Sequence, residues 1–232
     1  MKTLIAVPCM DVMHHGFVSS LLRLVKGPDV DAVLKPNSLI YDSRNMISLT
    51  AIERGFDRVM WIDSDMAFTS DAMQILIADM EGKDWKTGEY IDREKDFVTG
   101  IYFKRKTPIT PVLYKHIEEP DIGPDGKPIR HIEDYLDYPK DSIFPVKGCG
   151  FGFCMTSTKL LKEVWEKFGP AFSPYPWAGE DISFCYRVNQ LGHTIWCDSR
   201  VSCGHIGTYI FTERDYDETK KRGDANEQTE GR

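Results

Sequence analysis

The sequence predicts an α/β fold with a largely parallel central sheet. Short apolar runs typical of buried strands alternate with amphipathic stretches typical of helices. The runs are apolar throughout, as expected for parallel strands that are covered on both faces. One run, at 58–62, ends abruptly in Asp63-Ser64-Asp65. Ligands bind beyond the carboxyl ends of such strands, so these carboxylates stand where chemistry is expected.

The elements follow in chain order. We expect strands at 3–8, 30–34, 58–62, 96–103 and 194–197, where apolar residues cluster. We expect helices at 16–26, 43–55, 72–80, 158–167 and 180–191, where an apolar stripe recurs at helical spacing. Side chains suited to cap a helix precede three of these helices: Ser43, Ser70 or Asp71, and Ser157 or Thr158. Glycines follow two of the helices, namely Gly55 and Gly192.

The middle and the end of the chain have a different character. Residues 107–147 are rich in Pro, Asp and Tyr, with a turn signal at 124–127 between runs at 112–117 and 129–138. We expect a hairpin-like insertion there, which either covers a substrate site or is a plain surface meander. Residues 213–232 are polar and lack periodicity, so we expect a disordered or loosely attached tail after one domain at 1–212.

Composition limits the function classes. The chain has 232 residues and a formal net charge of −7, which disfavours a dedicated nucleic-acid binder but allows an enzyme that meets DNA through a local patch. No run approaches the roughly 18 apolar residues of a membrane span, and the start lacks a signal peptide's apolar region. We therefore expect a cytoplasmic protein. Its six cysteines lack a CxxC pair and are expected to be reduced, although Cys197, Cys203 and His205 are also an alternative zinc set.

Two groups of residues are suited to metal chemistry. Asp63 and Asp65 can hold a hard divalent cation that clamps a diphosphate, although solvated loops carry the same triplet. His205 lies between glycines in Gly204-His205-Ile206-Gly207, where a tight turn could present it as a nitrogen ligand. A surface-turn histidine is the alternative.

Three further patterns are suited to substrate binding or catalysis. Glu180-Asp181 at a helix start could supply a general base or could simply complement the helix dipole. The glycines of Gly148-Cys149-Gly150-Phe151 do not match a dinucleotide fingerprint; they either let a sugar approach the backbone or form a turn. Arg44-Asn45 suits a phosphate and a base or ribose. The aromatic residues that lie in Pro/Gly-rich loops can stack on a sugar or base; they are Phe151, Tyr175 and Trp177.

Taken together, these stretches resemble the nucleotide-sugar glycosyltransferases of the GT-A fold, most closely the small family-2-like members of bacteria and phages. The resemblance covers about residues 3–210, and the stretches that carry it are 43–45, 59–65, 98–104, 148–151, 179–181 and 196–208. It implies one Rossmann-like domain with helices on both faces of the sheet. It also implies that acceptor recognition lies in the insertion at 107–147.

The resemblance further implies a role for each matching residue. Asp65 would bind Mn²⁺ or Mg²⁺ directly, Asp63 would contact the metal, its water or the donor ribose, and His205 would be a further ligand. Asp181 would be the catalytic base, with Glu180 beside it. The donor, a UDP-sugar by preference, would contact Pro8, Arg44, Asn45, Asp63, Ser64, Tyr102, Lys104, Gly148 and Gly150. The acceptor would contact Phe151, Tyr175 and Trp177.

The expected reaction transfers the sugar, with inversion, to an acceptor hydroxyl on a glycan or on a hydroxylated base in phage-type DNA. Three alternatives remain open. A nucleotidyltransferase that makes a nucleotide-sugar would release pyrophosphate. A non-catalytic carbohydrate-binding relative would bind a glycan without metal. A metal-dependent hydrolase would need no acceptor.

Overall fold

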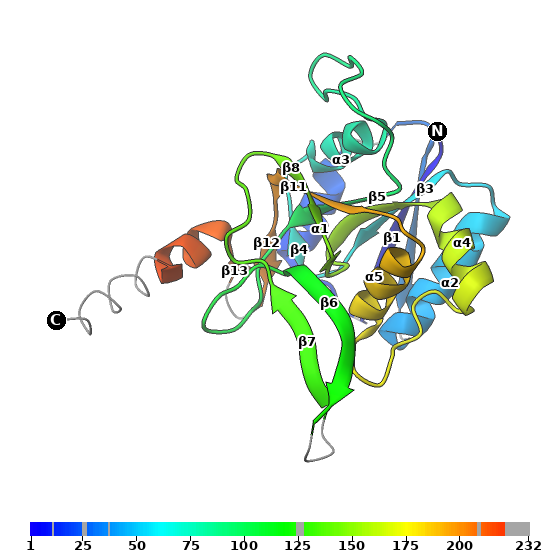
Figure 1. Cartoon of the computed structure of the whole chain (residues 1–232). Coiled ribbons are helices and arrows are strands. Elements are labelled where there is room, and N and C mark those ends of the chain that lie inside the picture. The colour runs from blue at the N-terminus through cyan, green and yellow to red at the C-terminus, as the bar shows by residue number, and fades with distance from the viewer. Residues whose placement is uncertain (11, 25–26, 37, 124–127, 208–209, 221–232) are drawn as a thin grey trace.

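The computed structural model describes residues 1–10, 12–24, 27–36, 38–123, 128–207 and 210–220. Its centre is a seven-stranded sheet in the order β2-β1-β3-β10-β5-β11-β8 (Figure 1). The bounds of these strands, in chain order, are β1 Thr3–Cys9, β2 Val30–Pro36, β3 Arg58–Ile62, β5 Phe97–Ile101, β8 Ile143–Val146, β10 Phe153–Ser157 and β11 Ile195–Ser202.

The sheet is mostly parallel, as the sequence predicts. Strand β1 pairs in parallel with β2 and β3, and β11 pairs in parallel with β5. Strand β10 lies antiparallel between β3 and β5, and β8 is antiparallel to β11 at the edge. Strands β1, β2, β3, β5 and β11 therefore share one direction, and their carboxyl ends lie at one side of the sheet.

Helices cover both faces of this sheet. The helices are α1 His15–Arg23, α2 Ile40–Glu53, α3 Ala72–Met80, α4 Thr158–Phe168 and α5 Glu180–Gln190. Successive residues of a strand point to opposite faces. In β1, Leu4 and Ala6 pack in one core with α2, α4 and α5, whereas Ile5 and Val7 pack in a second core with α1 and α3. The fold is a single three-layer α/β domain.

One predicted helix cap is confirmed and another is wrong. Helix α4 is capped by Ser157, whose Oγ accepts a hydrogen bond of 3.0 Å from the Leu160 amide, as predicted. The cap predicted at Ser43 is wrong, because α2 begins at Ile40 after Leu39. Ser43 is buried inside the helix, and its amide donates to the Leu39 carbonyl. The helix therefore begins before its polar start signal.

The insertion contains the predicted hairpin. Strands β6 (Leu113–Ile122) and β7 (Pro128–Asp134) pair antiparallel and project beyond one end of the sheet (Figure 1). The short strand β9 (Gly148–Cys149) joins β6 on its other side. The expected turn at 124–127 lies outside the described residues, as do Val25 and Lys26 of the first expected helix.

The start of the expected tail is folded. Residues 213–220 are helical, and Tyr216 is buried with its ring stacked on Phe103 at 5.1 Å between centroids. The Tyr216 hydroxyl donates to the Leu136 carbonyl, and Tyr138 donates to Glu213 at 2.7 Å. The expectation of a loose tail is therefore wrong for this part, because one aromatic residue in a polar segment anchors it. Residues 221–232 lie outside the part of the chain that is described.

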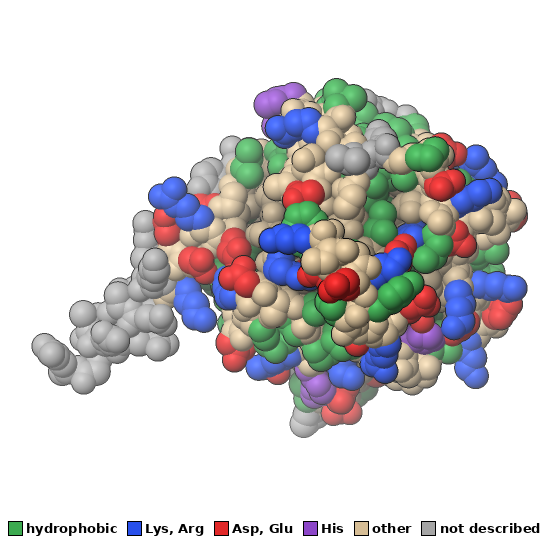
Figure 2. Space-filling view, turned by 90° about the horizontal axis from the view of Figure 1, so that it is seen from above, with side chains coloured by type: hydrophobic (Ala, Val, Ile, Leu, Met, Phe, Trp, Pro, Cys, Tyr) green, Lys and Arg blue, Asp and Glu red, His purple; other side chains and the backbone are tan. Residues whose placement is uncertain are grey.

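Two features of the described residues bear on binding to membranes and to nucleic acid. Among the described residues, no helix is both long enough and apolar enough to cross a bilayer. Basic and acidic side chains are interspersed over the face seen from above (Figure 2). Neither sign of charge dominates this face.

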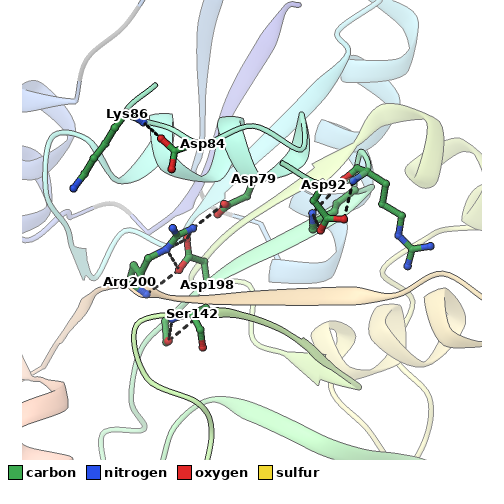
Figure 3. A network of polar contacts seen from close by, with 10 residues as sticks. Asp79, Asp84, Lys86, Asp92, Ser142, Asp198 and Arg200 are labelled. Carbon is green, nitrogen blue, oxygen red and sulfur yellow. Dashed lines mark hydrogen bonds and ion pairs between the residues drawn. The ribbon is translucent and has the colours of Figure 1, made fainter. Parts of the chain in front are cut away.

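A buried carboxyl pair joins α3 to β11. Asp79 of α3 and Asp198 of β11 are both buried, and Arg200 contacts each of them, with Nη2 at 3.1 Å from Asp79 and 2.7 Å from Asp198 (Figure 3). Burial, together with the hydrogen bond to Asp198 and its charge, raises the pKa of Asp79 to about 8. Asp79 therefore keeps its proton at neutral pH and allows two carboxyl groups to lie side by side.

This pair makes folding stability depend on pH. Asp79 is protonated in the folded protein up to about pH 8, whereas its ordinary pKa is 3.8. Between these values the folded state binds the extra proton, so raising the pH lowers stability. Asn mimics the protonated acid. We expect the melting temperature of Asp79→Asn to exceed that of the wild type by most at pH 9, and the difference to shrink steadily as the pH falls toward 3.8.

The control for this measurement is Glu94→Gln, which changes an exposed carboxylate in the neighbouring loop. Its melting temperature should follow the wild type at every pH. Parallel wild-type and Asp79→Asn melting curves from pH 5 to pH 9 would contradict the assignment.

Candidate functional site

An open pocket of about 680 Å³ lies beyond the carboxyl ends of β1 and β3. Pro8 lies at the carboxyl end of β1 and lines the pocket, and Asp63, Ser64 and Asp65 follow β3 into it. The first turn of α2 completes the wall; the remaining lining residues are Cys9, Met10, Ser38, Leu39, Ile40 and Ser43. Three residues expected to contact the donor (Pro8, Asp63 and Ser64) and the expected metal ligand Asp65 therefore meet in one pocket, at the strand ends where α/β sheets bind ligands.

Arg44 of α2 connects the two acidic motifs. Its side chain is only 3% exposed, its Nη2 lies 2.8 Å from Asp63 Oδ1, and its Nη1 donates to Glu180 Oε1. The guanidinium also lies over the Phe151 ring at 5.3 Å. Burial acts to lower the pKa of Arg44, but the charges of Asp63 and Glu180 outweigh it and raise that pKa. Arg44 is thus a buried, charged bridge between β3 and α5.

The surroundings of Asp63 and Asp181 raise the pKa of both side chains. Burial raises the pKa of Asp63, and the nearby Arg44 charge only partly offsets this. Burial and the adjacent charge of Glu180 raise the pKa of Asp181 to about 6. One oxygen of Asp181 accepts from the Ile182 amide at 2.7 Å, in the first turn of α5. A carboxylate whose pKa lies near neutrality is suited to take up a proton.

A small sheet brings His205 to Asp65. Strand β12 (Gly204–Ile206) pairs with β4 (Met66–Ala67) and with β13 (Ile210–Phe211), and the Ile206 amide donates to the Asp65 carbonyl at 2.7 Å. His205 Nε2 lies 3.5 Å from Asp65 Oδ2. Its Nδ1 lies 2.8 Å from the Phe103 carbonyl, which only accepts hydrogen bonds, so Nδ1 carries a proton and Nε2 faces the carboxylate.

Asp65 and His205 are suited to supply part of the ligand set of a divalent cation. A histidine whose Nδ1 is held by a carbonyl and whose Nε2 faces a carboxylate has the orientation typical of a metal ligand. Burial acts to raise the pKa of Asp65, but the hydrogen bond with His205 and the charges of His205 and Arg105 outweigh it and lower that pKa. No cluster of three His, Cys, Asp or Glu side chains suited to a metal occurs in the described part of the chain. Mn²⁺ or Mg²⁺ would therefore need phosphate and water ligands as well.

Several residues expected to bind the donor have other partners. The Asn45 side chain accepts from the Phe172 amide at 2.8 Å. Lys104 Nζ lies 2.6 Å from Asp134 of the hairpin. Tyr102 is buried, and its hydroxyl accepts from the Gly152 amide at 3.1 Å. None of these three residues lines the pocket after β1 and β3, and each is bonded to another part of the protein.

The glycine motif is a packing motif. A Cβ on Gly150 would lie 2.0 Å from Tyr102 Oη, and one on Gly148 would lie 2.3 Å from Ile117 Cδ1. Phe151 is 1% exposed and packs among core aromatic rings. The sugar contact expected of the glycines and the acceptor contact expected of Phe151 do not fit these positions, because neighbouring side chains already fill the space.

Two predicted acceptor residues are half-buried beside α5. Tyr175 and Trp177 stack on each other, with ring centroids 5.5 Å apart and planes 7° apart, and Tyr186 of α5 packs edge-on against both. They precede Glu180-Asp181 on the same loop. Their position next to the expected base is compatible with acceptor binding, which stays a prediction.

The alternative zinc set is not assembled. All six cysteines are free, and Cys197 and Cys203 are buried in the apolar cores. Cys197 belongs to the core beneath α5 and Cys203 to the core beneath α1 and α3. The two thiols therefore lie on different faces of the sheet, which separates the ligands that the sequence places close together.

Sequence reasoning overlooked Arg105. Its Nη1 lies 3.0 Å from Asp65 Oδ2 and 2.6 Å from the Ile206 carbonyl. The signal for it was the run of three cations Lys104-Arg105-Lys106 immediately after an apolar strand. Which of the three faces the pocket depends on the path of the loop after β5, and no local pattern reveals that path.

The buried bridge yields a stability prediction. Arg44→Ala leaves the partly buried carboxylates of Asp63 and Glu180 without their partner. We expect a loss of up to about 3–5 kcal/mol, the cost of breaking a fully buried pair. The neighbouring Asn45→Ala removes one hydrogen bond and should cost about 1 kcal/mol. Urea denaturation of both variants measures the difference. An Arg44→Ala loss no larger than that of Asn45→Ala would contradict the bridge.

Comparisons with known proteins give structural matches alone. No family model and no curated protein sequence matches the chain. The crystal structure of A197 from STIV matches with a TM-score of 0.63 and 17% identity, over 91% of this chain and 94% of that one. The crystal structure of GalNAc-T7 with UDP, GalNAc and Mn²⁺ matches with a TM-score of 0.58 and 11% identity, over 95% of this chain and 48% of that one. The chain thus spans about half of the GalNAc-T7 chain. Its single α/β domain is similar in fold to a GT-A glycosyltransferase.

Proposed function

We propose that this protein is a metal-dependent glycosyltransferase that moves a sugar from a UDP-sugar to an acceptor hydroxyl with inversion. The observation that carries the proposal is the arrangement of two unlike acidic sites around Arg44. Arg44 pairs with Asp63, in the same motif as Asp65 and its partner His205, and with Glu180, the neighbour of Asp181 at the start of α5. The fold similarity to a glycosyltransferase crystallised with UDP and Mn²⁺ supports it.

The donor end of the proposal rests on the pocket after β1 and β3. Pro8 and Ser64 would contact the nucleotide, and Asp63, oriented by Arg44, would face the ribose or a metal-bound water. Asp65 and His205 would hold Mn²⁺ or Mg²⁺, whose positive charge stabilises the departing diphosphate. The pocket is open to solvent along the first turn of α2, which leaves room for a nucleotide to enter.

The acceptor end rests on the different partners of the two adjacent acids. Glu180 is held by Arg44, so its carboxylate is committed to an ion pair. Asp181 has a pKa raised to about 6 and is the better base. It would take the proton of the acceptor hydroxyl as that oxygen bonds to the anomeric carbon and the bond to the diphosphate breaks. A single displacement of this kind inverts the configuration.

Binding of nucleotides tests the donor half. We expect calorimetry to show UDP binding in Mn²⁺ that EDTA abolishes, and slow release of UDP from a UDP-hexose. Asp65→Asn should lose the metal-dependent binding, because it removes the only carboxylate that faces His205 among the described contacts. Asp29→Asn is the matched control, since Asp29 is exposed before β2, at the opposite end of the parallel strands.

Three results would overturn the proposal. Absence of binding across UDP-, GDP-, CDP- and ADP-sugars with Mn²⁺ present would remove its donor half. Pyrophosphate release from a nucleoside triphosphate and a sugar phosphate would indicate a nucleotidyltransferase. Binding of a glycan that EDTA leaves unchanged, with no turnover of any donor, would indicate a carbohydrate-binding protein.

The pH dependence of UDP release tests the base. Because Asp181 must be deprotonated to act, we expect kcat/KM to fall below about pH 6. Asp181→Asn should lower turnover by about 100-fold or more while UDP still binds. Glu180→Gln should move the acid limb to lower pH, since the Glu180 charge helps to raise the Asp181 pKa. An acid limb that persists unchanged in Asp181→Asn would assign the base elsewhere.

A further inference from the structure

Three consecutive cations follow β5, and they have different partners. Lys104 is paired with Asp134 of the hairpin at 2.6 Å. Lys106 lines a separate pocket next to the hairpin. Arg105 turns the other way, toward the carboxylate that ends the Asp63-Ser64-Asp65 motif. The loop therefore delivers one guanidinium to the proposed donor site and uses the flanking lysine to secure the hairpin.

Arg105 shares one oxygen with His205. Arg105 Nη1 lies 3.0 Å from Asp65 Oδ2, and His205 Nε2 lies 3.5 Å from the same atom. Arg105 Nη1 also donates to the Ile206 carbonyl at 2.6 Å. The Arg105 side chain is 42% exposed and that of Asp65 is 33% exposed. The Arg105–Asp65 ion pair is therefore exposed to solvent, and Arg105 is held only through the end of its side chain. The Arg44 side chain, by contrast, is almost fully buried.

A divalent cation and Arg105 need the same group. A cation held by Asp65 and His205 would use the lone pairs of the oxygen that now accepts from Arg105, and two positive charges on one carboxylate repel. A solvent-exposed ion pair of this kind contributes little stability, typically about 0–1 kcal/mol. Arg105 can therefore separate from Asp65 at little energetic cost. Its hydrogen bond to the Ile206 carbonyl is made by the same Nη1 atom.

We propose that Arg105 is a diphosphate-binding residue that exchanges partners. It pairs with Asp65 in the ligand-free protein and with the phosphate oxygens of the nucleotide in the loaded one. This inference rests on the proposed function and adds a residue to it. A planar guanidinium binds phosphate oxygens in pairs, and withdrawing it from Asp65 frees that oxygen for the cation. Nucleotide and cation should then strengthen each other's binding, because each favours the same state of Arg105.

The experiment measures three affinities in the full chain. Mn²⁺ alone is titrated by the electron-spin signal of the free ion, and UDP and uridine are titrated by calorimetry in saturating Mn²⁺. For Arg105→Ala we expect Mn²⁺ alone to bind several-fold more tightly, since its competitor is gone. UDP should bind about tenfold more weakly, which is the effect of losing about 1.4 kcal/mol of phosphate contact, and uridine should bind as in the wild type.

Two further variants sharpen the measurement. Lys106→Ala removes a neighbouring charge that does not contact Asp65, and all three of its affinities should equal those of the wild type. Arg105→Lys keeps the charge without the planar fork, so its UDP affinity should lie between those of the wild type and Arg105→Ala. Thermal melting should be unchanged in all three variants, because only exposed side chains are altered.

The outcomes separate this inference from the function that it rests on. If the wild type binds UDP with Mn²⁺ and Arg105→Ala binds it equally well, the inference is overturned and the proposed function stands. The same holds if Arg105→Ala weakens uridine as much as UDP, or if it weakens Mn²⁺ alone. If the wild type fails to bind UDP in Mn²⁺, the proposed function fails and this inference falls with it.

Discussion

The buried guanidinium of Arg44 holds the site together. It links the end of β3, through Asp63, to the first turn of α5, through Glu180, and it lies on the face of Phe151. A charge at this depth is tolerable only when its partners surround it. The positions of both acidic motifs are therefore constrained by one side chain, and a shift of either element would leave a buried charge unpaired.

The net negative charge of the site favours a bound cation. Asp63, Asp65, Glu180 and Asp181 carry up to four negative charges, and Arg44 and Arg105 carry two positive ones, so the formal sum is −4 + 2 = −2 when Asp181 is ionised. A nucleotide diphosphate would be repelled by such a cluster. A divalent ion between them cancels the repulsion, and the raised pKa of Asp181 lets the protein reduce it further by holding a proton.

Among the residues that the sequence predicts to contact the donor, more serve as supports than line the pocket. Gly150 makes room for the Tyr102 hydroxyl, which in turn holds the Gly152 amide. Asn45 holds the Phe172 amide at the start of the loop that leads to α5. In a sequence such residues are indistinguishable from ligand-binding ones, because both are polar groups or glycines next to an active-site motif. The structure separates them by showing whether a protein atom already occupies each donor or acceptor.

The sequence by itself determined the α/β class, the mostly parallel sheet, the hairpin and the place of the Asp63-Ser64-Asp65 motif at a strand end. These follow from local signals, namely apolar runs, helical stripes and turn residues, whose physics acts over a few residues. Only the tertiary structure decided which groups meet. It set His205 against Asp65 through the pairing of β12 with β4, turned Arg105 rather than Lys104 toward the pocket, and buried Tyr216 in the presumed tail. Each of these contacts joins segments that are distant in the chain, and their partners are selected by packing and charge pairing in three dimensions, which local propensity does not encode.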